Sequence, residues 1–302
     1  MKKFCLLLTA YCLLFSLLPS ACSLSSVQDK RILLGTTVEI KAVGQDREEL
    51  QRKINLAFAE IDRLEKIFDF HNPKSELSRL NKDAAQQSVG VSEDLFFVIK
   101  KAVEFSELTD GAFDPTINSP NKEASYKDIG LNEKKRTIFF SREGLKIDLG
   151  GCAKGYIVDQ VAKGLRESGV SSFLINAGGD IIASGREWKI GIQHPQGRNK
   201  ILRVLKLRNK AIATSGNYLR KHIINPQSKQ VAEDNILSST IISNSCLKSD
   251  ILATAVFVLG KDKGLRLIEG LKDAEGTIVV KQEERIETIF SSGFNGGKDE
   301  KK

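Results

Sequence analysis

The stretch LKIDLGGCAKGYIVD, at residues 145–159, says more about the fold than any other part of the sequence. Its alternating first half predicts a strand that delivers Asp148 to a tight Gly150-Gly151 turn, and its second half predicts a helix with Lys154 in the first turn. Small residues at such a turn let a ligand approach the backbone, while free N–H groups and the helix dipole favour an anion. The turn can therefore hold a phosphate, although an isolated glycine pair is more often a plain strand–helix connection beside a solvated lysine. The sequence contains neither GxxxxGK[ST] nor GxGxxG, two common nucleotide-binding signatures.

Hydrophobic spacing on both sides of this stretch predicts an α+β protein. A buried helical face is indicated by apolar residues at three- and four-residue intervals, namely Ile54, Phe58, Ile61, Leu64 and Phe68. A second helix is expected from Ser92, a typical N-cap, to Leu108. Because helix-rich and strand-rich runs occur without strict βαβ alternation, we expect a single domain with mixed or antiparallel sheets and packed helices. The other predicted elements are strands at 33–43, 136–140, 144–149, 172–176, 181–184, 188–193, 201–208 and 211–214, and helices at 154–168 and 250–259 that end at Gly169 and Gly260.

Composition excludes several classes of protein. The chain has 302 residues, of which 41% are hydrophobic and 28% are charged, which is enough apolar material for a buried core and excludes a disordered or fibrous protein. The net charge is +8, but basic and acidic residues are interspersed instead of forming a basic stripe. We therefore expect no nucleic-acid partner.

The N-terminus has the composition of an export signal. Two lysines precede an apolar run, and the run ends in a zone of small residues before Cys22, which resembles a bacterial lipobox except that Pro19 stands where leucine is usual. Ordinary cleavage nearby, or an uncleaved anchor, remains the alternative. We expect a lipoprotein signal peptide at 1–21 with Cys22 as the acylated mature N-terminus, and hence a lipid-anchored protein on the periplasmic side of the inner membrane. A tether at 22–32, a domain at 33–293 and a polar tail at 294–302 complete the predicted organisation.

A second informative stretch is NSCLKSDILATAVFVLG at residues 244–260. Asp250 and Thr254 are four positions apart on a predicted helix, so their oxygens project from one face near its N-terminus. A carboxylate and a hydroxyl suit a hard cation such as Mg²⁺, which keeps waters and accepts phosphate oxygens as further ligands. Alternatively, Asp250 is only a cap or first-turn acid and Thr254 a packing residue.

Three polar turns supply further candidate residues. NAGGD (176–180) presents Asp180, ATSGNY (213–218) offers hydroxyls and backbone N–H groups, and HIINP (222–226) places His222 beside polar residues. A lone histidine of this kind is usually only a surface residue, and no Ser/His/Asp hydrolase pattern occurs. A disulfide between Cys152 and Cys246 stays open, and no cysteine or histidine spacing indicates zinc.

Taken together, the order of these motifs resembles that of a known family. DLGGCAKGYIVD, NAGGDI, ATSGNY, HIINP and SDILATAVFVLG, preceded by TDGAFDPT (109–116) and LLGTTVEI (33–40), resemble the ApbE-type flavin transferases. The resemblance covers about residues 33–293. It implies a single α+β domain that binds FAD and Mg²⁺, moves FMN onto a threonine hydroxyl of a partner protein and releases AMP. It further implies acceptors among the subunits of membrane redox complexes, such as sodium-pumping NADH:quinone oxidoreductase or Rnf-type complexes.

The resemblance also assigns roles to residues. Asp250 and Thr254 would hold Mg²⁺ through their side chains and Gly151 through its carbonyl, and Ala253 stands where some members carry an additional acid. The segment after Thr116 is short and lacks the Trp-Gly-Phe usual there. The implied flavin-nucleotide contacts are Asp148 and Lys154, with Gly111, Ala112 and Phe113 lining the adenine side, Leu34 packing beside the cofactor and His222 near the pyrophosphate.

The chemistry of the residues agrees with this reaction. Attack of a hydroxyl on a pyrophosphate needs charge neutralisation on the phosphoryl oxygens, which Mg²⁺ and Lys154 would supply. His222 is the preferred general base, and Asp180 is the second candidate. Two alternatives remain open at this point: hydrolysis of FAD to FMN and AMP with water as acceptor, and a flavin-binding lipoprotein without catalytic activity.

Overall fold

The computed structural model describes residues 24–294, apart from 198–199, 218–222, 233–234 and 284. The expected signal peptide, Cys22 and nearly all of the expected polar tail therefore lie outside the described residues. No helix in the described part is long and apolar enough to cross a membrane.

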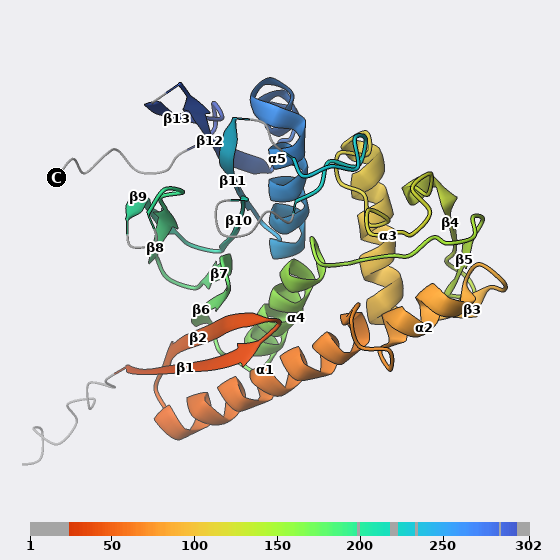
Figure 1. The fold of residues 1–302 in the computed structure, drawn as a ribbon. Coiled ribbons are helices and arrows are strands. Elements are labelled where there is room, and N and C mark those ends of the chain that lie inside the picture. Colours follow the sequence, from red (N-terminus) through yellow and green to blue (C-terminus); the bar gives the residue numbers. More distant parts are fainter. Residues whose placement is uncertain (1–23, 198–199, 218–222, 233–234, 284, 295–302) are drawn as a thin grey trace, which may run out of the picture.

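The centre of the protein is an eight-stranded, fully antiparallel sheet (Figure 1). Its strand order is β1-β2-β6-β7-β10-β11-β12-β13, so strands from both halves of the chain lie side by side. The pairing of β2 with β6 and of β7 with β10 joins the N-terminal hairpin to the C-terminal strands. The strands are β1 (Ser25–Leu33), β2 (Thr36–Gly44), β6 (Ser172–Ala177), β7 (Asp180–Ser184), β10 (Lys210–Ser215), β11 (Ile236–Ser243), β12 (Ala274–Gln282) and β13 (Arg285–Phe290).

Helices α1 (Arg47–Phe68), α4 (Ala153–Glu167) and α5 (Cys246–Glu269) cover one face of this sheet. The hairpin of β8 (Trp188–Gln193) and β9 (Ile201–Leu207) covers part of the other face, where Trp188 packs among aliphatic side chains. A central strand such as β7 therefore contributes Ile182 to the core under the helices and Ile181 to the core under the hairpin. The remaining elements, beyond α1 and α4 in Figure 1, are α2 (Glu76–Asp83), α3 (Glu93–Leu108), a 3₁₀ turn η1 (Tyr126–Asp128) and a small sheet of β3 (Val89–Gly90), β4 (Ile129–Asn132) and β5 (Thr137–Phe140).

The predicted α+β class and both N-terminal helices are confirmed. All five apolar residues predicted for the first helical face are buried in α1. Helix α3 begins after Ser92, whose side chain accepts a hydrogen bond from the Leu95 N–H, and ends at Leu108. Gly169 follows α4 with φ +86°, as expected for the residue after a helix C-terminus.

Three expectations about elements were wrong. Residues 25–32 of the expected tether form most of strand β1, paired along their whole length with β2. Residues 144–149 form no strand: Gly144 lies in a turn with φ +77°, and 145–149 have no regular secondary structure. Helix α5 begins at Cys246, and although Gly260 has a non-helical conformation with φ +84°, a further helical segment continues to Glu269. Strands β11, β12 and β13 were not predicted.

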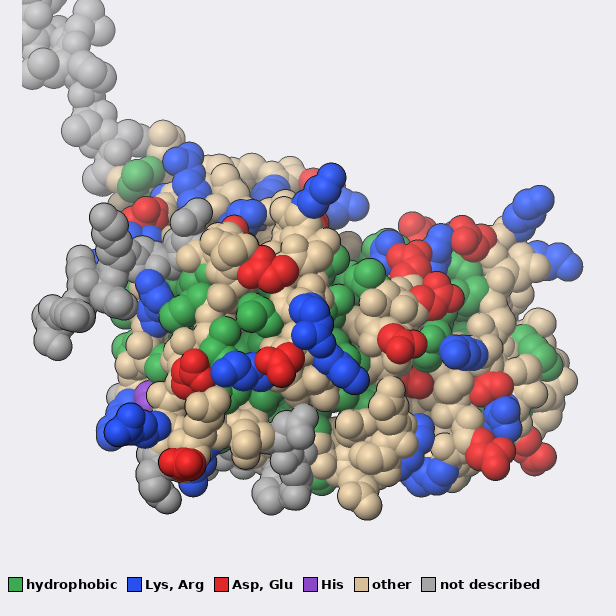
Figure 2. Space-filling model, turned by 90° about the horizontal axis from the view of Figure 1, so that it is seen from above, with side chains coloured by type: hydrophobic (Ala, Val, Ile, Leu, Met, Phe, Trp, Pro, Cys, Tyr) green, Lys and Arg blue, Asp and Glu red, His purple; other side chains and the backbone are tan. Residues whose placement is uncertain are grey.

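The two cysteines of the described part are free and buried, so Cys152 and Cys246 form no disulfide. The face in Figure 2 shows acidic and basic side chains interspersed around hydrophobic ones, in keeping with the charge pattern of the sequence.

Candidate active site

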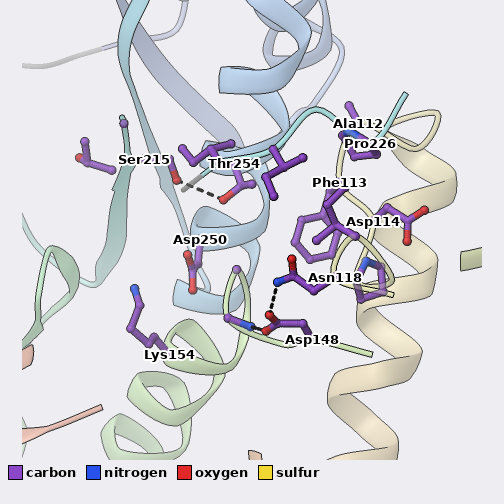
Figure 3. Close-up of a pocket in the computed structure, with 18 of the residues that line it drawn as sticks. Ala112, Phe113, Asp114, Asn118, Asp148, Lys154, Ser215, Pro226, Asp250 and Thr254 are labelled. Carbon is purple, nitrogen blue, oxygen red and sulfur yellow. Dashed lines mark hydrogen bonds between the residues drawn. The ribbon is translucent and has the colours of Figure 1, made fainter. Parts of the chain in front are cut away.

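A cavity of about 560 Å³ opens at the end of the large sheet where β2 begins and β10 ends. One wall comes from the start of α4 and the adjoining face of α5, and the opposite wall comes from the loop after α3 (Figure 3). Polar and apolar side chains from segments far apart in the sequence meet there. The lining residues include Thr36, Ala112, Phe113, Asp114, Asn118, Asp148, Gly151, Lys154, Ser215, Asp250 and Thr254.

The turn that leads into α4 is held by side chains and not by a neighbouring strand. The Asp148 carboxylate accepts hydrogen bonds from the Gly150 N–H at 2.8 Å and from the Asn118 side-chain amide at 2.6 Å. The N–H of Asp148 itself donates to the Pro115 carbonyl. The turn and the loop after α3 are thereby fixed to each other across one edge of the cavity.

Asp250 and Thr254 lie on the same side of α5, as their four-residue spacing predicts (Figure 3). The Asp250 carboxylate is 5% exposed, and its Oδ2 accepts a hydrogen bond from the Gly155 N–H at 3.1 Å. The Thr254 hydroxyl lies 3.2 Å from that of Ser215, at the end of β10. Ser245 is the N-cap of α5, and its side chain accepts a hydrogen bond from the Lys248 N–H.

Gly151 lies against the same face of α5. A Cβ atom added to Gly151 would be 3.7 Å from the Thr254 hydroxyl oxygen and 3.1 Å from the Phe113 ring. A glycine at this position therefore keeps the backbone close to Thr254 while Phe113 covers it. The structure brings together the three residues expected to hold a cation, from two segments about 100 positions apart.

Lys154 forms an ion pair with Asp180, which is 2% exposed at the start of β7. Burial disfavours the charged form of Lys154, but the carboxylates of Asp180 and Asp250 outweigh burial and raise its pKa above the ordinary lysine value. Lys154 is therefore a fixed positive charge at the cavity wall. Asp180 does not line the cavity, but its carboxylate pairs with the Lys154 ammonium and so keeps that charge in place.

The donor set near Asp250 suits a hard cation. Burial raises the pKa of Asp250 to about 7, and Asp180 adds to this effect against the opposing charge of Lys154. A buried carboxylate of this kind is stabilised in its charged form by a cation. In the described residues, no group of three or more His, Cys, Asp or Glu could hold a metal. A cation here would therefore depend on Asp250, Thr254 and the Gly151 carbonyl, with remaining positions for water or phosphate, which fits the preferences of Mg²⁺.

Of the other expected ligand contacts, some line the cavity and some do not. Ala112 and Phe113 line the cavity, but Gly111, at φ +73°, faces a neighbouring depression that Asp114 also lines. Leu34 occupies the β1–β2 turn, where its N–H donates to Glu65, and Thr36 lines the cavity instead. His222 lies outside the described residues, so its role stays a prediction.

Sequence reasoning missed several lining residues. Asn118, which holds Asp148, carried no distinguishing pattern, and Thr36 lay within LLGTTVEI, where Leu34 was the expected contact. Asp114 lay within the TDGAFDPT motif, and its carboxylate accepts hydrogen bonds from the Thr116 hydroxyl and the Tyr126 N–H. Ser215 lay within ATSGNY, where the sequence indicated hydroxyls but not their contact with Thr254.

Comparisons with known proteins agree with this arrangement. The ApbE family model matches residues 34–123 and 118–278. A curated FAD:protein FMN transferase from Vibrio cholerae is 26% identical over 302 residues, covering 86% of this chain and 89% of the relative. One from Klebsiella pneumoniae is 28% identical over 287 residues, covering 84% and 89%.

Solved structures show the same fold. The flavin transferase ApbE from Vibrio cholerae superposes with a TM-score of 0.81 at 25% identity, covering 90% of this chain and 99% of that one. The ApbE protein from Thermotoga maritima gives a TM-score of 0.80 at 27% identity, covering 90% and 98%. The similarity therefore extends over nearly the whole described part of the chain.

Proposed function

Because this chain belongs to the ApbE family, we propose that it is a transferase that moves FMN from FAD to a protein acceptor. The names of its curated relatives support this activity. The observation that carries the proposal is the convergence of Gly151, Lys154, Asp250 and Thr254 on one cavity. A cationic lysine and a hard-cation donor set at one wall suit a substrate with adjacent phosphates.

The finer proposal is that transfer depends on Mg²⁺, held by Asp250, Thr254 and the Gly151 carbonyl. When bound, the cation would neutralise charge on the pyrophosphate and on the departing AMP. Lys154 would add a second positive charge, kept in place by Asp180. Asp148, fixed by Asn118, and the apolar pair Ala112 and Phe113 would orient the flavin nucleotide in the cavity.

The acceptor group in this proposal is a threonine hydroxyl, which attacks the phosphorus of the FMN half and releases AMP. The proton of that hydroxyl needs an acceptor, for which His222 is the better candidate. Asp180 is the weaker one, because its carboxylate is buried and paired with Lys154. We further propose lipid attachment at Cys22, a location on the periplasmic side of the inner membrane, and acceptors among the subunits of membrane redox complexes.

Two other functions remain as outcomes of a test. Hydrolysis of FAD to FMN and AMP would use the same cavity with water as acceptor. Flavin storage is disfavoured by the buried carboxylate of Asp250, because simple storage has no need of a cation on the pyrophosphate.

The test incubates the full chain with FAD, MgCl₂ and a candidate acceptor, followed by denaturing electrophoresis. Flavin fluorescence retained on the acceptor band supports transfer, AMP release without a labelled band supports hydrolysis, and neither product supports storage. We expect Asp250→Ala, or excess EDTA with the wild type, to slow transfer at least about 100-fold. Asp262→Ala, an exposed acid on the same helix, is the matched control and should transfer at the wild-type rate. Unchanged transfer in Asp250→Ala would remove the proposed cation site.

A further inference from the structure

Helices α4 and α5 pass each other in opposite directions, and their contacts follow a regular step. Gly151 lies beside Thr254, and the Gly155 N–H donates to Asp250. One turn further along α4, Asp159 accepts a hydrogen bond from the Cys246 N–H. Each advance of four residues on α4 thus corresponds to a retreat of four residues on α5.

The middle contact admits only glycine. A Cβ atom at position 155 would lie 2.6 Å from the Cys246 carbonyl oxygen and 2.7 Å from the Leu247 Cα. These are backbone atoms, which cannot turn aside as a flexible side chain can. The close approach lets the helices touch, but one glycine and its single hydrogen bond to Asp250 do not by themselves fix the position of the first turn of α5 along α4.

Asp159 supplies that missing constraint. Its Oδ1 accepts from the Cys246 N–H at 2.8 Å, and its Oδ2 accepts from the Leu247 N–H at 3.0 Å and the Ser245 hydroxyl at 2.7 Å. The first N–H groups of a helix have no partner within the helix, so a carboxylate from outside satisfies donors that would otherwise be unpaired. One side chain on α4 is therefore joined to the start of α5 by three hydrogen bonds.

We propose that Asp159 is a positioning residue for the cation site. It sets the register of α5 against α4 so that Asp250 and Thr254 meet the Gly151 carbonyl at the other end of the contact. The inference rests on the proposed cation-dependent function, because the residues it aligns are the proposed ligands. Asp159 is two helical turns from Gly151 and does not line the cavity, so it acts only through the two helices.

The first measurement is cation affinity. Thermal unfolding of the FAD-loaded full chain is followed as MgCl₂ is added, and the concentration giving half of the maximal stabilisation is read. We expect Asp159→Asn to raise this concentration about 10- to 100-fold, the usual effect of removing a group that orients metal ligands. Ser245→Ala removes one of the three bonds and should produce a smaller shift in the same direction.

The matched control is Asp94→Asn. Asp94, on α3, also holds α4, because its carboxylate accepts a hydrogen bond from the Tyr156 hydroxyl at 2.7 Å. Tyr156 follows Gly155, yet its partner is α3 instead of α5, so this variant loosens α4 without disturbing the α4–α5 register. Its half-saturating Mg²⁺ concentration should stay within about twofold of wild type.

The second measurement needs neither cation nor flavin. Cys246 is fully buried in the first turn of α5, and Cys152 is fully buried at the N-cap of α4. Labelling with a thiol reagent, read peptide by peptide by mass spectrometry, should therefore be slow at both. We expect Asp159→Asn to speed labelling of Cys246 at least about tenfold and leave Cys152 near its wild-type rate, because local opening exposes a buried thiol.

The outcomes separate the two hypotheses. Unchanged labelling of Cys246 in Asp159→Asn would overturn the register claim. Faster labelling with an unchanged Mg²⁺ requirement, or an equal shift in Asp94→Asn, would reduce Asp159 to a merely structural residue. If Mg²⁺ had no effect on the wild type, the cation dependence of the proposed function would fall, and with it the role of Asp159 in a cation site.

Discussion

At the scale of single residues, the site depends on the balance between two buried carboxylates and one partly exposed lysine. Asp180 and Asp250 are 2% and 5% exposed, and Lys154 is the cation that offsets both. An unpaired charge destabilises the folded protein far more when it is buried than when it is exposed. Lys154 therefore contributes to stability in addition to any contact with phosphate. Mutations can separate the contribution of Lys154 to stability from its contribution to flavin transfer.

We expect Lys154→Met to lower the free energy of unfolding by about 2 kcal/mol, because it leaves the Asp180 carboxylate buried without its partner. The double variant Lys154→Met/Asp180→Asn should recover part of that loss, since the charge of Asp180, the direct partner of Lys154, is gone. Flavin transfer should be absent in both. Urea denaturation and the fluorescent acceptor assay measure the two effects, and a double variant as unstable as the single one would contradict the charge argument.

Much of the candidate site could be predicted from local patterns, because its central residues sit on helices with regular spacing. Asp250 and Thr254 share a face by the four-residue rule, and Gly151 and Lys154 follow from a glycine turn before a helix. Asn118 could not be found in this way, because its contact with Asp148 joins two loops 30 positions apart. Contacts of that kind depend on how the whole chain folds, which local spacing does not encode.

At the scale of elements, strand predictions failed in a segment whose backbone hydrogen-bonds to side chains instead of to a neighbouring strand. They also failed where both faces of a strand are buried. In the segment 144–149, the backbone of Ile147 pairs with the Asn81 side chain and that of Lys146 with Ser119, so an alternating sequence forms no ladder. Strand β11 carries four buried hydroxyl residues between its aliphatic ones, which breaks the pattern of alternation. Strand β1 is an edge strand with mainly polar side chains, so it resembles a tether in composition.

The close contact of α4 with α5 gives a matched pair of glycine variants. Gly155→Ala should lower the free energy of unfolding by about 2 kcal/mol, because the added methyl meets backbone atoms of α5. Gly164→Ala, on the exposed side of the same helix, has open space around the new methyl and should raise stability by about 0.5–1 kcal/mol through helix propensity. Equal effects at the two positions in urea denaturation would show that α4 does not press on α5 as described.

The small sheet has an acid-sensitive support in Asp128. Burial alone would raise its pKa, but the Ser125 N–H, the Arg142 guanidinium and the Ser141 hydroxyl outweigh burial and lower the pKa below the usual aspartate value. A carboxyl whose pKa is lower in the folded state stabilises the fold above about pH 3.9, and this contribution is lost as the pH falls through the folded-state pKa.

We therefore expect Asp128→Asn to be less stable than wild type by about 1 kcal/mol at pH 7, with the difference shrinking towards zero at lower pH. Urea denaturation at several pH values measures the trend. Glu133→Gln serves as the control, because its ion pair with Lys100 is largely exposed and should matter little at any pH. A constant difference down to pH 2 would show that the charge of Asp128 is not what stabilises the sheet.

At the scale of the whole molecule, the cavity and the start of the folded chain lie at opposite ends of the same strands. Thr36 and Gly178 line the cavity, whereas Ser25 pairs with Gly44 at the other end of β2. The nine residues of β2 span roughly 27 Å at 3.4 Å per step. Because β1 already begins at Ser25, a lipid on Cys22 would hold this end within about 10 Å of the bilayer and direct the cavity away from it.

If Cys22 carries the proposed lipid, this geometry predicts a preference for acceptors displayed far from the membrane. In vesicles that carry the lipidated enzyme, an acceptor peptide on a rigid spacer of about 30 Å should be flavinylated several-fold faster than the same peptide held at the surface, because only the former reaches the cavity. Insertion of 20 Gly/Ser residues between Leu24 and Ser25 would extend the attachment by about 25 Å and should abolish the preference. The same insert appended after Lys302 should leave the preference intact. Equal rates for both peptides with the enzyme that lacks the insert would contradict attachment to the membrane through the β1 end. A protein attached there cannot present the cavity to the bilayer surface.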